Sequence, residues 1–231
     1  MQIQLLDEKI EFPSVDKANE LGLLAVGGDL SPARLIAAYE HGVFPWYNPD
    51  EEILWWAPKT RAIIPLEEIK IHKSMRNILN REIFKVTFDT CFDKVVKGCA
   101  TADRGNPNEG TWISSDIHNA YCNLHELGLA HSVEVWDGEK LVGGLYGVSI
   151  GTMFFGESMF SNSPNASKVA LIKLAQTLKK WDFGPIDCQI MNEHLSTLGA
   201  IEITREEFQK LLNYHLTSSL TKKGVWTDEI L

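Results

Sequence analysis

The sequence predicts an α+β protein built around one central mixed sheet. From about residue 70, the expected elements run helix, strand, two helices, three strands, helix, strand and two helices, without regular alternation of strand and helix. The three consecutive strands form a meander that is followed by a long helix and one further strand. Hydrophobic residues make up 44% of the 231 residues, which is enough for a core and too many for a disordered chain.

The N-terminal region differs in composition from the rest of the chain. Residues 1–65 hold six of the nine prolines and three of the seven tryptophans. Because proline fixes φ and removes a hydrogen-bond donor, we expect short helices and ordered loops here. One helix has clear signals, since Ser31 can cap it, Pro32 suits its first position and Gly42 ends it. We therefore expect a small N-terminal domain over 1–65 and a second domain over 66–231.

The elements of the second domain follow from hydrophobic periodicity. The expected helices are 74–80, 91–100, a segment starting near Ser115, a segment opened by Pro164 and Asn165, 193–198, and 205–215. The expected strands are 84–89, 131–138, 140–151, 152–160 and 186–190. The pair Asp137-Gly138 predicts a hairpin turn between two of these strands. We expect 101–110 to form a polar loop and the tail after Tyr214 to fray.

Composition and motifs exclude several classes of protein. No segment approaches the ~20 apolar residues that a membrane span needs, and residues 1–13 lack the pattern of a secretory signal. The four cysteines form no C-x-x-C pair, which argues against a zinc or disulfide framework and favours a reducing cytoplasm. The net charge of -9 argues against whole-surface attraction to nucleic acid, although not against a local basic patch. Neither a P-loop nor a G-x-G-x-x-G fingerprint is present.

Glu157 is the most informative single residue. It lies in the expected strand 152–160, where its neighbours are Phe, Met and Gly. A carboxylate in an apolar strand is costly unless it has partners. Glu157 could be a strand-edge residue that faces water, but the apolar residues flanking it on both faces favour burial. Because a buried acid in a cleft is a candidate for chemistry, we treat Glu157 as a site residue.

Asp187 and Gln189 form a second candidate. Strict alternation along 186–190 would put both side chains on one face of the strand. An acid beside an amide can hold and orient an amine or a hydroxyl. The alternative interpretation of this pattern is a half-exposed strand whose outer face is polar and has no function. The helices on both sides of this strand in the sequence favour a covered position. We expect Asp187 to be ionised and hydrogen-bonded to the amide of Gln189.

Four tryptophans form a third group. Trp46 and Trp112 lie in the loop contexts FPWYNP and EGTWIS, where an aromatic ring can stack on a base or line an apolar pocket. Trp55 and Trp56 are expected in the core of the small domain.

A basic run stands out in this acidic chain. Between residues 70 and 85, only Glu82 opposes five firm positive charges, which are Lys70, Lys73, Arg76, Arg81 and Lys85. Such a cluster can contact phosphates. A solvated helix face is the alternative interpretation, but the segregation of these cations from the acidic residues keeps phosphate binding open.

Several long segments together resemble one known family, the leucyl/phenylalanyl-tRNA–protein transferases. They are GLLAVGGDLSPARLIAAYEHGVFPW, WWAPKTRAII, GTWIS, AYCNLHELGLAHSVEVW, LVGGLYGVSIG, FFGESMFS, NASKVALIKL and IDCQIMNEHLSTLGA. The resemblance runs from about residue 12 to residue 215, nearly the whole chain.

The resemblance implies a fold and a reaction. Leu, Phe or, less well, Met would move from its tRNA to the α-amino group of a protein that begins with Arg or Lys, which marks that protein for N-end-rule degradation. The fold would be a small N-terminal domain on a second domain similar to the N-acetyltransferases (GNAT), acting in the cytoplasm without CoA, metal or ATP. This agrees with SNSPNASK, which lacks the glycine-rich loop that would cradle a pyrophosphate.

The resemblance also implies roles for particular residues. Asp187 and Gln189 match the proposed catalytic pair of the family. The residues expected to bind the substrates are Trp46 and Trp112 for the terminal adenosine, Leu145 and Phe154 for the transferred side chain, and Glu157 and Ser161 at the same site. The catalytic pair could act through a hydrogen-bonded proton relay, or the site could act mainly by positioning the two substrates.

Two other interpretations remain open from the residues alone. The first is a GNAT-fold transferase that uses an acyl-CoA, which the missing glycine-rich loop argues against. The second is a non-catalytic module that binds RNA or peptide.

Overall fold

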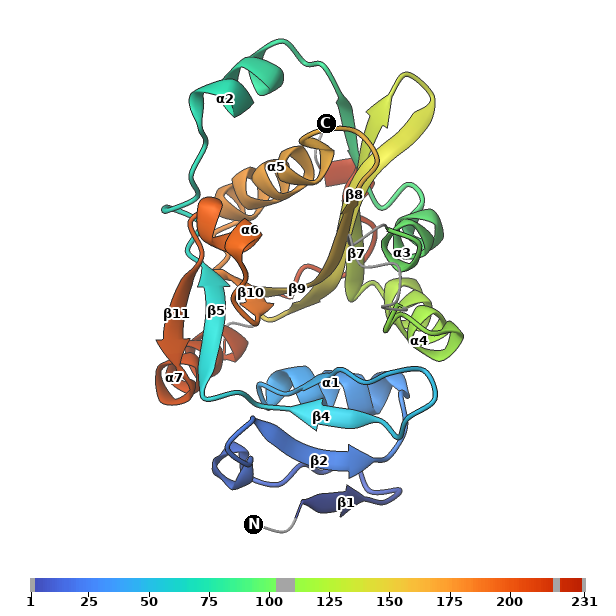
Figure 1. Ribbon diagram of the computed structural model, residues 1–231, viewed down its shortest axis with the longest axis vertical. Helices are drawn as coiled ribbons and strands as arrows, with labels where there is room; N and C mark the ends of the chain where they lie inside the picture. Colours follow the sequence, from blue (N-terminus) through green and yellow to red (C-terminus); the bar gives the residue numbers. More distant parts are fainter. Residues whose placement is uncertain (1–2, 103–110, 218–220, 230–231) are drawn as a thin grey trace.

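The computed structural model describes residues 3–102, 111–217 and 221–229, and within these ranges the strands form two sheets (Figure 1). Most of the expected loop 101–110 lies outside the described residues. The expected α+β class with a mixed sheet is confirmed. No helix in the described ranges is both long and apolar enough to cross a bilayer.

The N-terminal sheet has four short strands in the order β1-β2-β4-β3. Its elements are β1 (Gln4–Leu6), β2 (Leu23–Gly27), β3 (Phe44–Pro45) and β4 (Leu54–Trp56), with a 3-10 turn at Val15–Lys17. The expectation of helices and loops alone was wrong here, because strands of two to five residues are too short to show alternation. The predicted helix is confirmed as α1 (Pro32–Glu40), where the Ser31 hydroxyl accepts a hydrogen bond from the backbone N–H of Arg34.

The larger sheet has seven strands in the order β11-β5-β10-β9-β8-β7-β6. The strands are β5 (Thr60–Ile64), β6 (Lys85–Phe88), β7 (Ala130–Asp137), β8 (Lys140–Ile150), β9 (Met153–Ser161), β10 (Ile186–Gln189) and β11 (Ile201–Thr204). Strands β6 to β9 are an antiparallel meander, and β10 pairs parallel to β9 and antiparallel to β5. The expected hairpin at Asp137-Gly138 is confirmed, with Gly138 at φ 58°.

Six helices accompany this sheet in the described residues. They are α2 (Lys73–Asn80), α3 (Phe92–Ala100), α4 (Ser115–Glu126), α5 (Ala166–Lys180), α6 (Glu193–Thr197) and α7 (Arg205–Leu216). Figure 1 shows α5 on one side of β7 and β8, with α3 and α4 on the other. The apolar stripe predicted for α4 is buried at Ile117, Ala120, Tyr121 and Leu124. Helical periods of this length are readable in the sequence, which is why these elements were predicted.

Strands β5 and β11 were not predicted. Both are short, and they pair with each other, while β5 also pairs with β10, in each case across a long sequence separation. Strand β5 therefore belongs to the larger sheet, although it precedes residue 66. The division of the chain near residue 65 stays a proposal.

Trp226, in the described part of the tail after Tyr214, is anchored, contrary to the expectation that this tail frays. Trp226 is 1% exposed, and its ring stacks on His131 with centroids 3.7 Å apart. Its backbone N–H donates to Asp89 Oδ2 at 2.9 Å. One large aromatic side chain thus fixes a polar segment that local sequence alone would leave loose.

Trp226→Ala should lower the free energy of unfolding by about 3–5 kcal/mol, because it removes a fully buried aromatic ring. Urea denaturation measures this change. The neighbouring variant Val225→Ala is the control, since Val225 is 57% exposed and its loss should cost little. Equal stabilities of the two variants would contradict the anchoring.

Candidate active site

The site opens where β9 and β10 part. The two strands pair only at Phe154 with Ile186 and at Phe155 with Asp187. Beyond these pairs each strand carries an extra residue relative to its antiparallel neighbour, Glu157 opposite β8 and Cys188 opposite β5. Such β-bulges bend a strand and re-aim its side chains. Two bulges at the same level therefore splay the sheet and leave space between its halves.

An apolar cavity of about 360 Å³ lies beside this opening. Its apolar lining comes from Leu145, Phe154, Met159, Leu171, Leu174, Ile186 and Leu195. The ring of Phe154 fits here because residue 147 is glycine: a Cβ at that position would lie 2.5 Å from the ring. The cavity suits an apolar side chain.

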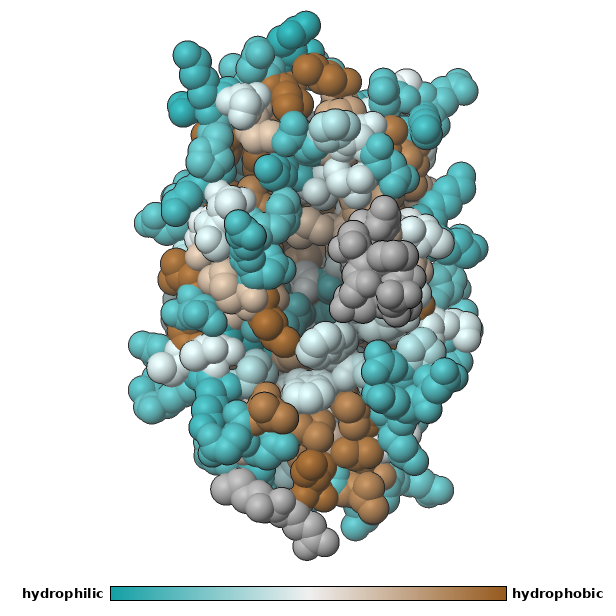
Figure 2. Space-filling model, viewed as in Figure 1, coloured by the Kyte–Doolittle hydropathy of each residue, from teal (hydrophilic) through white to brown (hydrophobic). Residues whose placement is uncertain are grey.

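A second cavity, of about 230 Å³, is lined by aromatic and polar residues and joins the first. The residues that line only this second cavity are Phe44, Pro45, Trp46, Ile190 and Met191. The two cavities share Trp112, Glu157, Cys188, Gln189 and Asn192. In the space-filling view, this face of the molecule is hollowed at its centre (Figure 2). An apolar chamber and an aromatic chamber thus meet at one acid, Glu157, and two amides, Gln189 and Asn192.

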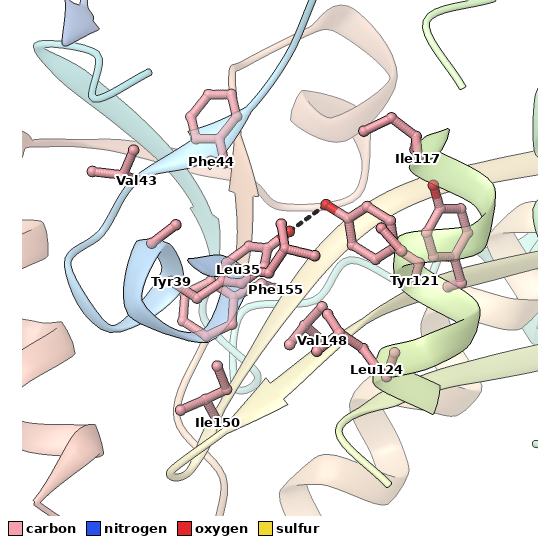
Figure 3. Packing of buried hydrophobic residues seen from close by; sticks show 14 of the residues in the cluster. Leu35, Tyr39, Val43, Phe44, Ile117, Tyr121, Leu124, Val148, Ile150 and Phe155 are labelled. Carbon is pink, nitrogen blue, oxygen red and sulfur yellow. Dashed lines mark hydrogen bonds between the residues drawn. The ribbon is translucent and has the colours of Figure 1, made fainter. Parts of the chain in front are cut away.

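Glu157 is partly buried and is held by two tyrosines. Tyr39 of α1 donates to one carboxylate oxygen at 2.7 Å, and Tyr121 of α4 donates to the other at 2.9 Å. The two hydroxyl groups also lie 2.5 Å apart (Figure 3). Burial raises the pKa of Glu157 to about 7, against the tyrosine hydrogen bonds, which lower it. The carboxyl group can therefore change its charge near neutral pH.

Asp187 lies behind the cavity wall, in a buried ion pair. Its two carboxylate oxygens accept from Nε and Nη2 of Arg61 at 2.8 and 2.7 Å, and Asp187 is fully buried. Arg61 also donates to the carbonyl of Gly42 at 3.1 Å. Its guanidinium lies 4.7 Å from the Phe44 ring centroid and 4.5 Å from that of Phe208. Asp187 lines neither of the two cavities.

The expected contact between Asp187 and the Gln189 amide is corrected by the structure. The side-chain nitrogen of Gln189 donates to Glu157 at 3.3 Å, and it is the backbone N–H of Gln189 that donates to Asp187, at 3.0 Å. The bulge at Cys188 breaks the alternation, so Gln189 reaches both cavities and Asp187 reaches neither. Gln189 has φ 57°, a left-handed conformation that is costly for a residue with a side chain. The bond to Asp187 helps to hold it.

Of the other predicted residues, Trp46 lies at a cavity, whereas Ser161 does not. Trp46 is 45% exposed at the mouth of the second cavity, while Trp55 is fully buried as expected for a core residue. Ser161 lies at the end of β9 and lines neither cavity, since its hydroxyl donates to the carbonyl of Ser163 and accepts from the N–H of Ser167. These hydrogen bonds join the end of β9 to the turn that precedes α5.

The basic run lies away from the two cavities, on and around α2. All five of its cations are exposed. Lys85 lines a groove between α2 and α5 together with Lys173 and Lys180. The charge of α2 thus continues onto α5.

Sequence reasoning missed three residues of the site. Tyr39 and Tyr121 were read only as positions on helix faces, since nothing local shows that their hydroxyl groups meet. Arg61 did carry a signal, because a single arginine directly before Ala-Ile-Ile must be paired if that strand is buried.

A partly buried acid beside amide groups, at the junction of an apolar and an aromatic chamber, suits the joining of an acyl group to an amine. Fold and site together define an enzyme of the acyl-transferring class.

The family described as leucyl/phenylalanyl-tRNA protein transferase matches residues 63–213, and its N-terminal domain matches residues 28–59. A relative with the family name from Cellvibrio japonicus is 53% identical over 88% of this chain and 86% of its own length. Another relative with the family name, from Syntrophus aciditrophicus, is 53% identical over 98% of this chain and 94% of its own length. A solved GCN5-related N-acetyltransferase from Kribbella flavida covers 75% of this chain and 63% of its own, at 10% identity and a TM-score of 0.32. The chain belongs to the leucyl/phenylalanyl-tRNA–protein transferase family, which is a family of aminoacyltransferases.

Asp187→Asn should lower the free energy of unfolding by about 3–5 kcal/mol, because it leaves Arg61 buried without its counter-charge. Thermal or urea unfolding measures the loss. Lys59→Ala, which breaks the exposed pair between Lys59 and Glu20, is the control and should have almost no effect. The double variant Arg61→Met with Asp187→Leu should regain much of the stability, and an unchanged stability of Asp187→Asn would contradict the role of the pair.

Proposed function

We propose that this chain transfers Leu or Phe, and less well Met, from aminoacyl-tRNA to the α-amino group of proteins that begin with Arg or Lys. The observation that carries the proposal is the meeting of an apolar and an aromatic chamber at Glu157 and Gln189, in a chain of this family. The modified proteins are then degraded by the N-end rule. We place the reaction in the cytoplasm, in keeping with four cysteines that form no disulfide.

The donor occupies both chambers. The transferred side chain lies in the apolar chamber against Leu145 and Phe154, and the terminal adenosine stacks at Trp46 and Trp112 in the aromatic chamber. The ester that joins them then lies at the junction, next to Glu157 and Gln189. Apolar lining accepts Leu, Phe and Met, and rejects charged side chains because they would lose their hydration.

The reaction makes modest demands on the protein. The ester is already activated, and an α-amine with a pKa of about 7.7–8.0 is partly neutral near pH 7.5. Holding the amine against the ester carbonyl supplies a large part of the acceleration. The Gln189 amide nitrogen donates to Glu157, which leaves the amide oxygen to accept a hydrogen bond from the amine. As the amine nitrogen bonds to the carbonyl carbon, ionised Glu157 takes the proton that the amine releases. The ester bond to the ribose then breaks, and Glu157 returns this proton to the departing ribose oxygen, which leaves as the hydroxyl group of the tRNA.

Asp187 serves as a positioning residue in this scheme. It neutralises Arg61 and holds the backbone of Gln189, so it acts on the amine through Gln189. The basic run around α2, continued by Lys173 and Lys180, binds phosphates of the tRNA without reading its sequence.

Transfer of labelled amino acid into a protein with N-terminal Arg tests the proposal. Phe-tRNA should be a good donor and Lys-tRNA a very poor one. Equal transfer from both, or transfer that does not depend on the N-terminal Arg or Lys, would contradict it.

The pH profile tests Glu157. Its pKa is raised to about 7, so the carboxyl group is protonated below this pH and ionised above it. The acceptor amine also titrates, so the informative quantity is the ratio of wild-type rate to Glu157→Gln rate. We expect this ratio to rise through pH 7 and then level off. A ratio that is constant from pH 6 to pH 8.5 would exclude proton acceptance by Glu157.

The salt dependence of binding tests the basic run. Lys73→Ser with Arg76→Ser should weaken aminoacyl-tRNA binding and lower the slope of log K against log salt by about 2. Transfer from a minimal aminoacyl-adenosine should be nearly unchanged, since it lacks those phosphates. The matched control is Lys59→Ser with Lys210→Ser, which removes equal charge elsewhere. If test and control variants bind equally, the cations of α2 do not contact the tRNA.

A further inference from the structure

Three different metal-ligating side chains meet between α3 and α4. Asp93 lies in the first turn of α3, and His118 and Cys122 lie one turn apart on α4. His118 Nε2 is 2.9 Å from Asp93 Oδ1 and 3.9 Å from Cys122 Sγ. The three donor atoms all lie within 4.8 Å of one another. None of the three lines either chamber, and the proposed reaction does not use them.

These distances suit a tetrahedral zinc ion. Zinc binds His nitrogen at about 2.0–2.1 Å, Cys sulfur at about 2.3 Å and carboxylate oxygen at about 2.0–2.2 Å, so tetrahedral donors lie roughly 3.4–3.6 Å apart. The observed 2.9 and 3.9 Å lie on either side of that spacing. The third pair, Asp93 with Cys122, lies within 4.8 Å, so movements of up to about 1 Å bring all three donors to that spacing, which side-chain rotation can supply.

The surroundings shape the contacts of each ligand. His118 Nε2 lies 2.9 Å from Asp93 Oδ1, where its N–H donates to the carboxylate, so a metal ion would displace this proton. The side-chain oxygen of Asn119, 3.4 Å from Nδ1, can accept from the other ring nitrogen. Lys97 pairs with Asp93 through Oδ2 at 2.8 Å, so Oδ1 faces the other two ligands. Cys122 lies one turn beyond His118 on the same face of α4, with Sγ 3.9 Å from His118 Nε2, so the thiol can turn toward an ion that the other two ligands hold.

We propose that Asp93, His118 and Cys122 bind one Zn²⁺ ion, with water in the fourth position. On binding, the thiol of Cys122 releases its proton to solvent and a zinc–sulfur bond forms. The ion ties α3 to α4. Because α4 also carries Tyr121, which holds Glu157, the zinc site would stiffen one wall of the chamber junction without touching the reacting atoms.

Cobalt titration of the reduced, metal-free protein tests this site. Co²⁺ should bind with one equivalent, give a thiolate-to-cobalt charge-transfer band and visible bands typical of tetrahedral geometry, and be displaced by Zn²⁺. Cys122→Ser should lose the charge-transfer band, and His118→Asn should weaken binding by at least tenfold. Cys91→Ser is the matched control and should behave like wild type, since Cys91 is not part of the cluster.

Zinc should also raise the melting temperature of the wild type and of Cys91→Ser, but not of Cys122→Ser. X-ray absorption of the zinc-loaded wild type gives an answer even where a variant fails to fold, and should show one sulfur among nitrogen and oxygen ligands. Binding without a sulfur ligand, no binding at micromolar metal, or loss of the band in Cys91→Ser would overturn the proposal.

Discussion

The buried ion pair between Arg61 and Asp187 is the interaction on which the site depends. It joins β5 to β10, and through the carbonyl of Gly42 and the ring of Phe44 it reaches the segment that follows α1. Buried pairs of this kind add little net stability over apolar residues of equal size. What this pair supplies is geometry, because Asp187 also holds the backbone of Gln189 in a left-handed conformation that β10 would otherwise avoid.

The rest of the site follows from that constraint. With Gln189 fixed, its amide meets Glu157 on the bulge of β9, and the two bulged strands part to leave chambers on either side. Tyr39 comes from α1 and Tyr121 from α4 (Figure 3). Glu157 therefore accepts hydrogen bonds from the N-terminal part of the chain and from the helical layer of the larger sheet. Burial and these two hydroxyl groups set its pKa near neutrality, where a group can both accept and return a proton.

The sequence predicted the parts of this structure that repeat over many residues. The meander β7–β9 and helices α4 and α5 show long periods, and Glu157 was recognisable because its neighbours are apolar. Strands of two to five residues in the N-terminal sheet were missed because so short a run shows no period. The bulge at Cys188 could not be predicted, since it arises from pairing with β5, and Arg61 and Asp187 are 126 positions apart. The hydrophobic pattern of the sequence thus identified candidate site residues. It could not identify the residues that they contact, because those contacts depend on tertiary packing.

A crystal structure with phenylalanyl-adenosine, its ester replaced by a stable amide, tests the central claim most directly. We expect the benzyl group in the apolar chamber against Phe154, adenine between Trp46 and Trp112, and the carbonyl beside Gln189. The ion pair between Arg61 and Asp187 should remain intact. Adenine in the apolar chamber, or the ligand bound away from Glu157 and Gln189, would contradict it.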